Sequence, residues 1–107
     1  LTLDSELSTG HRAIVSIARA LVSNPRILLF DEVLSPLDKH LQNHILTNFD
    51  NITKGKTLVM ASHYLKVIHK FDRLIVLDSG KLDGIGTHDE LLKTSELYSS
   101  LWNLETS

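Results

Sequence analysis

The stretch LSTGHRAIVSIARALVSNPRILLFDEVLSPLD, residues 7–38, decides the fold that we expect for this chain. After a small polar turn, four apolar residues follow at the i, i+3, i+4, i+7 spacing of one helix face: Ile14, Ile17, Ala18 and Leu21. Ser23-Asn24-Pro25 ends this helical pattern. Residues 27–30 then form an apolar run that is too short for a helix and predicts a strand buried on both faces. Two acids, Asp31 and Glu32, follow the run at once.

The remainder of the chain repeats this alternation of helical and strand patterns. Further elements are expected in this order: a helix carrying Leu37, Leu41 and Ile45, a second buried strand over 57–61, a short helix over 64–70, a third strand over 74–77, and its hairpin partner over 81–85. Residues 87–90 match a capping box, and Ser95 is a candidate cap for a last helix. We interpret the Gly-Ile-Gly at 84–86 as a turn. This order is typical of an α/β fold with a largely parallel sheet.

The composition is that of an ordinary globular domain. The chain has 107 residues, of which 42% are hydrophobic and 22% charged, and its formal net charge is −2. This near-neutral balance disfavours nucleic acid as a partner, because nucleic-acid-binding domains carry a basic surface. The absence of cysteine excludes disulfides and thiolate chemistry. Since the sequence does not begin with methionine, we expect a piece of a longer chain.

Polar residues follow the first two predicted strands, at the edge where parallel α/β sheets bind ligands. Asp31 can hold Mg²⁺ through water, since a hard cation prefers oxygen ligands, and Glu32 can orient or deprotonate an attacking water. The alternative is a strand that simply runs into a polar loop, and the two interpretations are evenly matched for these residues alone. His63, after the second strand, can donate a hydrogen bond to a phosphate oxygen. Its alternative is an ordinary histidine at the rim of a core.

Ser8, Thr9 and Gly10 stand at the start of the first predicted helix. A helix N-terminus presents free N–H groups and a positive dipole end, so it can bind phosphate, and glycine allows a close approach to the backbone. For these residues taken alone, a plain helix cap is the preferred interpretation. His40 and His44 lie at a spacing that can bind a metal, but no third ligand is nearby and a solvated helix face is preferred.

Taken together, the order and spacing of these motifs resemble the ATP-binding domain of ABC transporters, from its signature motif to its C-terminus. LSTGH (residues 7–11) stands where the family has its LSGGQ signature, and residues 12–32 align without gaps to the helix and Walker B strand that follow. SPLD (35–38) is similar to the family's D-loop, SALD, and ASHYL (61–65) to the segment with its switch histidine. Residues 72–102 are similar to the closing segment of exporter-type members.

This resemblance implies ATP and Mg²⁺ as ligands and gives roles to eight residues: ATP contact to Ser8, Thr9, Gly10, His11 and Asp38, Mg²⁺ binding to Asp31, and catalysis to Glu32 and His63. The signature residues would face the γ-phosphate of an ATP held by a partner domain, and Asp38 would reach across the interface between the domains. Glu32 would act on the hydrolytic water. His63 would contact the γ-phosphate of the ATP bound in its own domain.

Five positions depart from the family pattern, among them Val33 and Leu34, which stand where the family has Ala-Thr. Thr9 replaces the first glycine of the signature and His11 its glutamine; a β-branched residue resists positive φ and brings its side chain toward the phosphate path. Pro36 replaces the usual alanine of the D-loop and stiffens it. Because Glu32 and His63 are kept, we expect reduced but not absent ATP turnover in the intact protein.

The resemblance thus implies an α/β fold, specifically a partial P-loop NTPase-type three-layer fold with a mostly parallel sheet that lacks the Walker A half. Residues 1–107 would form the C-terminal portion of one ABC-type nucleotide-binding domain. No G-x-x-x-x-G-K-[ST] loop occurs in the sequence, so the chain alone is not expected to bind ATP tightly. The implied partners are a second ABC ATPase domain, in a homo- or heterodimer, and the transporter's transmembrane domains at the cytoplasmic face of the cell membrane.

The implied function is that of the ATP-hydrolysing component of an ABC transporter of the exporter type. Two alternatives stay open. A soluble ABC-type ATPase acting on DNA or in translation is disfavoured by the near-neutral charge and the exporter-like tail. A degenerate module that docks on a partner without catalysis is favoured by Thr9 and the missing phosphate loop, but disfavoured by intact Asp31, Glu32 and His63.

Overall fold

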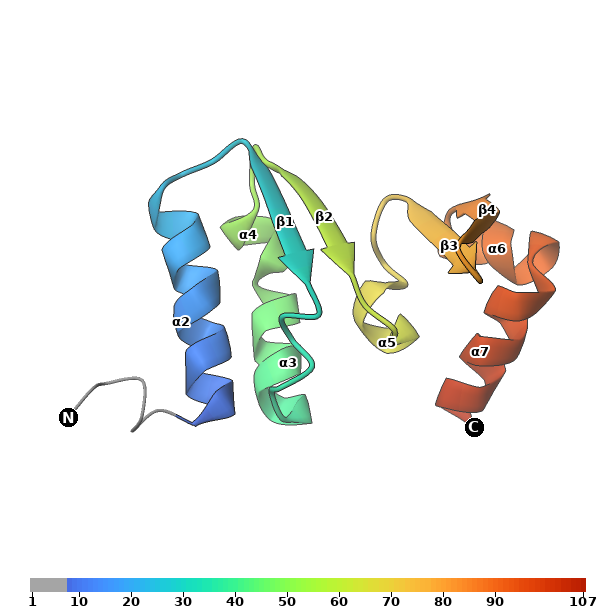
Figure 1. Ribbon diagram of the computed structural model, residues 1–107, viewed down its shortest axis with the longest axis horizontal. Helices are drawn as coiled ribbons and strands as arrows, with labels where there is room; N and C mark the ends of the chain where they lie inside the picture. Colours follow the sequence, from blue (N-terminus) through green and yellow to red (C-terminus); the bar gives the residue numbers. More distant parts are fainter. Residues whose placement is uncertain (1–7) are drawn as a thin grey trace. The chain divides into compact units, whose positions relative to one another are not determined.

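The structure is a computed structural model that describes residues 8–107, and the chain divides into two compact units, Leu1–Ser62 and His63–Ser107 (Figure 1). The described part of the first unit contains α2 (Thr9–Val22), β1 (Ile27–Asp31), α3 (Lys39–Thr47), α4 (Phe49–Ile52) and β2 (Thr57–Ala61). The second unit contains α5 (Leu65–Ile68), β3 (Leu74–Asp78), β4 (Lys81–Gly86), α6 (His88–Thr94) and α7 (Glu96–Thr106). This alternation confirms the α/β class.

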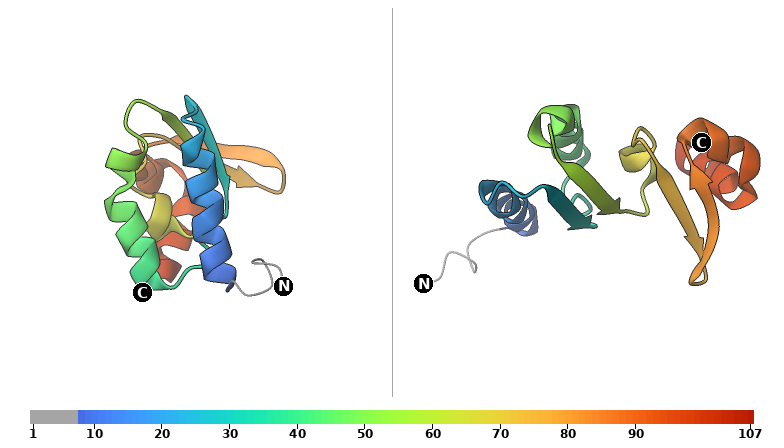
Figure 2. Two further views of the ribbon diagram at one scale, coloured as in Figure 1. Left: turned by 90° about the vertical axis from the view of Figure 1, so that its left-hand side faces the viewer. Right: turned by 90° about the horizontal axis from the view of Figure 1, so that it is seen from above.

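In the first unit, β1 and β2 form a parallel pair whose carboxyl ends meet at one edge. The register runs from Ile27 opposite Thr57 to Asp31 opposite Ala61. Helices α2 and α3 run alongside the pair (Figure 1), and the view from above shows both on the same side of it (Figure 2). The buried apolar residues of this unit come from the strands, the helices and the loop after β1: Ile17, Leu28, Phe30, Leu34, Leu37 and Phe49.

The expectation that these two strands are buried on both faces is wrong for the described residues. Leu28 and Phe30 are buried, but Ile27 and Leu29 are 61% and 74% exposed, and Val59 on the partner strand is 54% exposed. Successive side chains of a strand point to opposite faces, so helices on one side bury only every second residue. An apolar run therefore predicted the strands correctly, whereas their burial depended on what covers each face.

Several smaller expectations also need correction. Leu37 does not belong to the helix that carries Leu41, because it lies in the loop before the N-cap residue Asp38. The short helix expected over 64–70 covers only α5, and α4 was not expected at all. Residues 84–86 are not a turn but the end of strand β4, where small residues allow helix α6 to approach closely.

The second unit is built on an antiparallel hairpin packed against helices. Strands β3 and β4 are joined by Ser79 and Gly80, with φ of 52° and 78°, the left-handed values that a two-residue hairpin turn requires. The Thr87 capping box is present in full, and Ser95 caps α7 by accepting a hydrogen bond from the Tyr98 N–H, as predicted. The core of the unit consists of Leu65, Leu74, Leu91 and Tyr98, with Trp102 partly buried against it.

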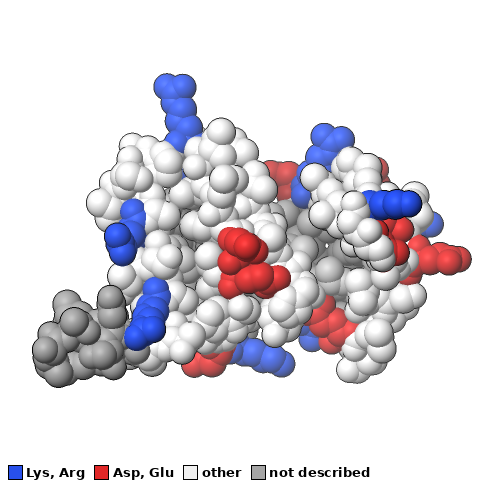
Figure 3. Space-filling view, viewed as in Figure 1, with Lys and Arg blue, Asp and Glu red and all other residues white. Residues whose placement is uncertain are grey.

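The surface carries charges of both signs. On the face seen in Figure 3, lysine and arginine side chains are scattered among acidic ones and do not form a single basic patch, which agrees with the near-neutral composition. Within residues 8–107, no helix has both the length and the apolar character that a membrane crossing needs.

The close approach of α6 to β4 gives a test of the fold. A methyl group at Gly84 would stand 3.1 Å from Cδ2 of the fully buried Leu91. Gly84→Ala is therefore expected to lower the free energy of unfolding by about 1 to 3 kcal/mol through overpacking. Urea denaturation followed by the fluorescence of Trp102, the single tryptophan of the chain, measures this. Lys81→Ala at the exposed start of the same strand is the control; equal stability of the two variants would contradict the packing described here.

Candidate functional site

Glu32 occupies a strained backbone position directly after β1. Its φ is 53°, in the left-handed region that residues with a side chain rarely adopt. The Glu32 N–H donates to the carbonyl oxygen of Ala61 at 2.9 Å, and the Glu32 carbonyl accepts from the Ser35 hydroxyl at 3.0 Å and the Ser35 N–H at 3.3 Å. Its carboxylate atom Oε2 is buried. Such strain persists only where surrounding bonds enforce it, and it is concentrated at functional sites.

Asp31 is the last residue of β1 and lies opposite Ala61, at the carboxyl edge of the parallel pair. It is exposed, so its carboxylate is accessible to a ligand. No cluster of three or more metal-binding side chains occurs among residues 8–107. A lone carboxylate suits Mg²⁺, which keeps several waters and is commonly held by one or two carboxylates together with substrate phosphates.

The start of α2 has the geometry of a capped helix. Ser8 is the N-cap residue, and its hydroxyl oxygen accepts a hydrogen bond from the His11 N–H at 3.1 Å. The hydroxyl hydrogen is still able to donate to a phosphate oxygen. Thr9 is the first residue of the helix, and its φ is not positive. The expected conflict between a β-branched side chain and a positive φ at this position was therefore wrong. Only its side chain can hinder a phosphate.

The N-terminus of α2 lies beside the loop that follows β1. A methyl group at Gly10 would stand 3.6 Å from Cδ2 of Leu37 and 3.9 Å from the carbonyl oxygen of Pro36. The signature-like turn and the loop after Glu32 are therefore neighbours in one unit, although more than 20 residues separate them in sequence. The first unit thus contains all the predicted site residues except His63, and Gly10 lies beside the loop that leads to Asp38.

Two side chains hold the loop between β1 and α3. The Asp38 carboxylate caps α3 by accepting from the Leu41 N–H at 2.8 Å. Gln42 donates from Nε2 to the carbonyl oxygens of Leu34 and Leu37, at 2.8 and 3.1 Å. Sequence reasoning missed Gln42, because nothing in a helical glutamine indicates that it reaches back to a loop. Asp38 is exposed, so its second oxygen can serve another contact.

Three other histidines were singled out in the sequence: His63, His40 and His44. His63 opens the second unit two residues beyond the end of β2, and its ring lies 4.2 Å, centroid to centroid, from the ring of Tyr64. Its proposed phosphate contact stays a prediction from its sequence position. His40 and His44 are both exposed on α3, in agreement with a solvated helix face.

Comparison with known proteins gives the family. The family model described as ABC transporter matches residues 2–35. The alpha-hemolysin translocation ATP-binding protein HlyB of Escherichia coli is 45% identical over 94% of the chain, and the leukotoxin export ATP-binding protein LtxB of Aggregatibacter actinomycetemcomitans is 44% identical over 94%. The solved structure of a bacterial Atm1-family ABC exporter with ATP bound matches 95% of the chain with a TM-score of 0.89 and 38% identity. The chain belongs to the ABC transporter ATP-binding family.

The chain is short relative to these proteins. It spans 14% of the length of HlyB and of LtxB, and 18% of the Atm1-family chain. The similarity therefore extends over nearly all of this chain but over a small share of each relative.

The Gln42 contacts give a test of the loop. Gln42→Ala removes the donor to two loop carbonyls and is expected to cost about 1 to 2 kcal/mol of stability. Amide exchange of residues 34–37 should rise with it, as measured by hydrogen exchange and mass spectrometry. Asn43→Ala, at the next and exposed position of α3, is the matched control. Unchanged exchange in the Gln42 variant would show that its side chain does not hold the loop.

Proposed function

We propose that the chain is a segment of the ATP-binding and ATP-hydrolysing component of an ABC exporter, which couples ATP hydrolysis to transport across a membrane. The observation that carries this proposal is the 45% identity, over 94% of the chain, to a translocation ATP-binding protein. The names of the similar proteins, which refer to translocation and export, favour this function over a soluble ATPase acting on DNA or in translation. Intact Asp31 and Glu32 at the strand edge favour it over a non-catalytic docking module.

The N-terminus of α2 is the proposed contact for ATP held by a second domain. The Ser8 hydroxyl and the free N–H groups of the first turn would face the γ-phosphate, with Thr9, Gly10 and His11 lining the approach. The positive end of the helix dipole favours a phosphate there. Asp38, beside this turn through the 35–38 loop, would contact the same interface.

The edge of the β1–β2 pair is the proposed site of hydrolysis. When bound, Mg²⁺ would neutralise charge on the ATP phosphates, and Asp31 is the residue proposed to hold it. Glu32 would orient the attacking water and accept its proton. The imposed backbone conformation and the buried Oε2 limit the freedom of the Glu32 carboxylate, as a positioned base requires. His63 would donate a hydrogen bond to the γ-phosphate of the ATP in its own domain.

The proposed partners follow from this arrangement. A second ABC ATPase domain would complete each ATP site, and transmembrane domains would receive the resulting movement at the cytoplasmic face of the membrane. Residues 1–107 would be the C-terminal portion of one nucleotide-binding domain, and other parts of the intact protein would provide the G-x-x-x-x-G-K-[ST] loop. ATP binding would favour the closed pair of domains and hydrolysis would release it, because the ligand binds one state more tightly than the other.

The role of Glu32 is tested in the intact protein. Glu32→Gln keeps the size of the side chain but removes the base, so steady-state ATP hydrolysis should fall by about 100-fold or more. ATP binding, measured by calorimetry, should remain. Asp50→Asn changes an exposed carboxylate in α4 and serves as the control. Hydrolysis at the normal rate in the Glu32 variant would contradict the proposed chemistry.

Two substitutions of Asp38 can distinguish its role as a helix cap from its proposed role at the domain interface. Asn caps a helix about as well as Asp, whereas Ala does not, so Asp38→Ala should lose about 1 kcal/mol of stability and Asp38→Asn very little. If the charge of Asp38 acts at the domain interface, both variants lower ATPase activity of the intact protein. Normal activity of Asp38→Asn would restrict this residue to its structural role. Denaturation midpoints and ATPase rates on the same preparations decide between them.

A further inference from the structure

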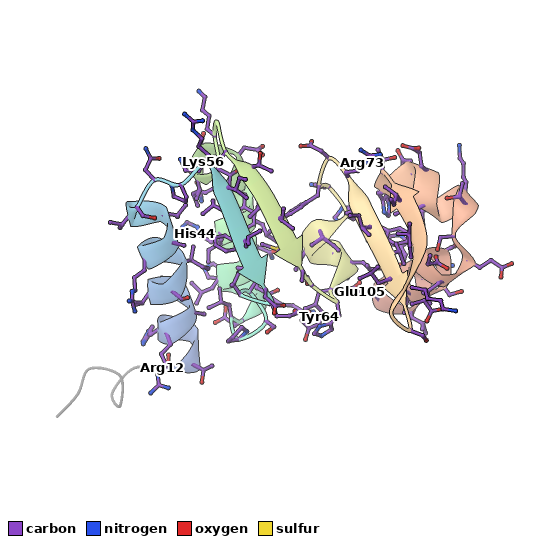
Figure 4. The ribbon with its side chains drawn as sticks, turned by 45° about the horizontal axis from the view of Figure 1, so that its top comes forward. Arg12, His44, Lys56, Tyr64, Arg73 and Glu105 are labelled. Carbon is purple, nitrogen blue, oxygen red and sulfur yellow. The ribbon has the colours of Figure 1, made fainter. Side chains whose placement is uncertain are left out.

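A carboxylate near the end of the chain caps the helix that follows His63. Glu105, on α7, accepts a hydrogen bond at Oε2 from the Leu65 N–H at 2.7 Å and one at Oε1 from the Lys66 N–H at 3.3 Å (Figure 4, in which Glu105 is labelled). The first N–H groups of a helix have no acceptor within the helix. Tyr64, the N-cap residue of α5, makes no side-chain cap hydrogen bond, so a residue 40 positions away provides the acceptor.

The other end of α5 is also held against α7. His69 follows the helix, and its Nδ1 lies 3.2 and 3.1 Å from the carbonyl oxygens of Leu65 and Lys66, which can only accept. The His69 ring packs against Trp102 of α7 with 5.0 Å between ring centroids. Leu65 itself is buried in the core with Tyr98. Helix α5 is therefore attached to α7 at its start, along its buried side and at its end.

The charge of Glu105 also affects the pKa of the buried Tyr98. Burial raises the pKa of the Tyr98 hydroxyl, and the nearby Glu105 carboxylate raises it further. The carboxylate thus accepts hydrogen bonds at the start of α5 and acts electrostatically on a tyrosine of its own helix. The two hydrogen bonds restrict the conformations that its side chain can adopt.

The anchored helix begins two residues after His63. The His63 ring lies against Tyr64, and the Tyr64 carbonyl accepts from the Val67 N–H at 3.1 Å, so Tyr64 is part of the first turn of the helix. Hydrogen bonds that hold the Leu65 and Lys66 amides therefore limit how far the backbone can move at His63, two residues earlier. A shift of about 1 Å in a catalytic or substrate-contacting group can cost on the order of 100-fold in rate.

We propose that Glu105 is a positioning residue for ATP hydrolysis: by capping α5, its carboxylate holds His63 in place for the γ-phosphate. The inference rests on the proposed function of His63. It assigns to the last turns of the chain a role in catalysis, exerted through the backbone of residues 63–66 rather than by contact with the nucleotide.

The structural half of the proposal is tested by hydrogen exchange on the intact protein. In Glu105→Ala, the Leu65 and Lys66 amides lose their acceptor, and exchange in the peptide covering residues 64–68 should accelerate about tenfold. Glu105→Gln retains one acceptor oxygen in place of the two that bond the Leu65 and Lys66 amides, and should show an intermediate increase. Glu96→Ala, a carboxylate in the first turn of the same helix, is the matched control and should leave this peptide unchanged. Unaltered exchange in Glu105→Ala would overturn the proposal.

The functional half is tested by ATPase kinetics. Glu105→Ala should lower kcat about tenfold with less than a twofold change in KM for ATP, and Glu105→Gln should recover part of the loss. In a His63→Ala background, Glu105→Ala should cause no further loss, because the capping acts through His63. Losses that multiply in the double variant would show a general structural effect and overturn the positioning role. A wild-type protein without ATPase activity would contradict the proposed function itself, before any Glu105 variant is compared.

Discussion

The parallel ladder between β1 and β2 is the constraint on which the candidate site depends. It sets Asp31 opposite Ala61 and continues one bond further, from the Glu32 N–H to the Ala61 carbonyl. This last bond, together with those from Ser35, holds Glu32 at a φ that costs about 1 to 3 kcal/mol. The burial of Leu28 and Phe30 in the same strand offsets the strain. The β1–β2 pair must therefore be folded for Glu32 to adopt this backbone conformation.

Several polar residues of the candidate site stabilise the fold and are also proposed to contact ATP or a second domain. Ser8 caps α2 and Asp38 caps α3, yet each keeps hydrogen-bonding capacity for a ligand or a second domain. If the proposed roles hold, stability and activity are coupled at these positions, and a substitution there changes both unless the replacement keeps the cap. In the second unit, Glu105 caps the start of α5 at Leu65, and the cap is proposed to position the residues that precede the helix.

Local chemistry was predictable from the sequence where the determining residues are neighbours. Ser8, Thr87 and Ser95 were expected as caps and are caps, because a cap needs only a hydroxyl three residues before an N–H. The strands were located by their apolar runs. Their one-sided burial was not predictable, since exposure of Leu29 depends on which elements cover the sheet.

Side-chain contacts between residues that are apart in the sequence could not be predicted from the motif pattern. The motif order predicted that Asp31 and Glu32 share a strand edge, and the parallel pairing supports their placement there. Gln42 contacts a carbonyl 5 positions away, and Glu105 contacts an amide 40 positions away. The residue type of these side chains gives no local signal of either contact. The roles of all eight predicted site residues toward ATP remain predictions.

The most direct test is a structure of the intact protein with ATP and Mg²⁺ bound. We expect the γ-phosphate of the ATP held by the partner domain within hydrogen-bonding distance of Ser8, and Asp31 and Glu32 beside the ATP held by their own domain. Phosphates located away from both the N-terminus of α2 and the carboxyl edge of the β1–β2 pair would contradict it.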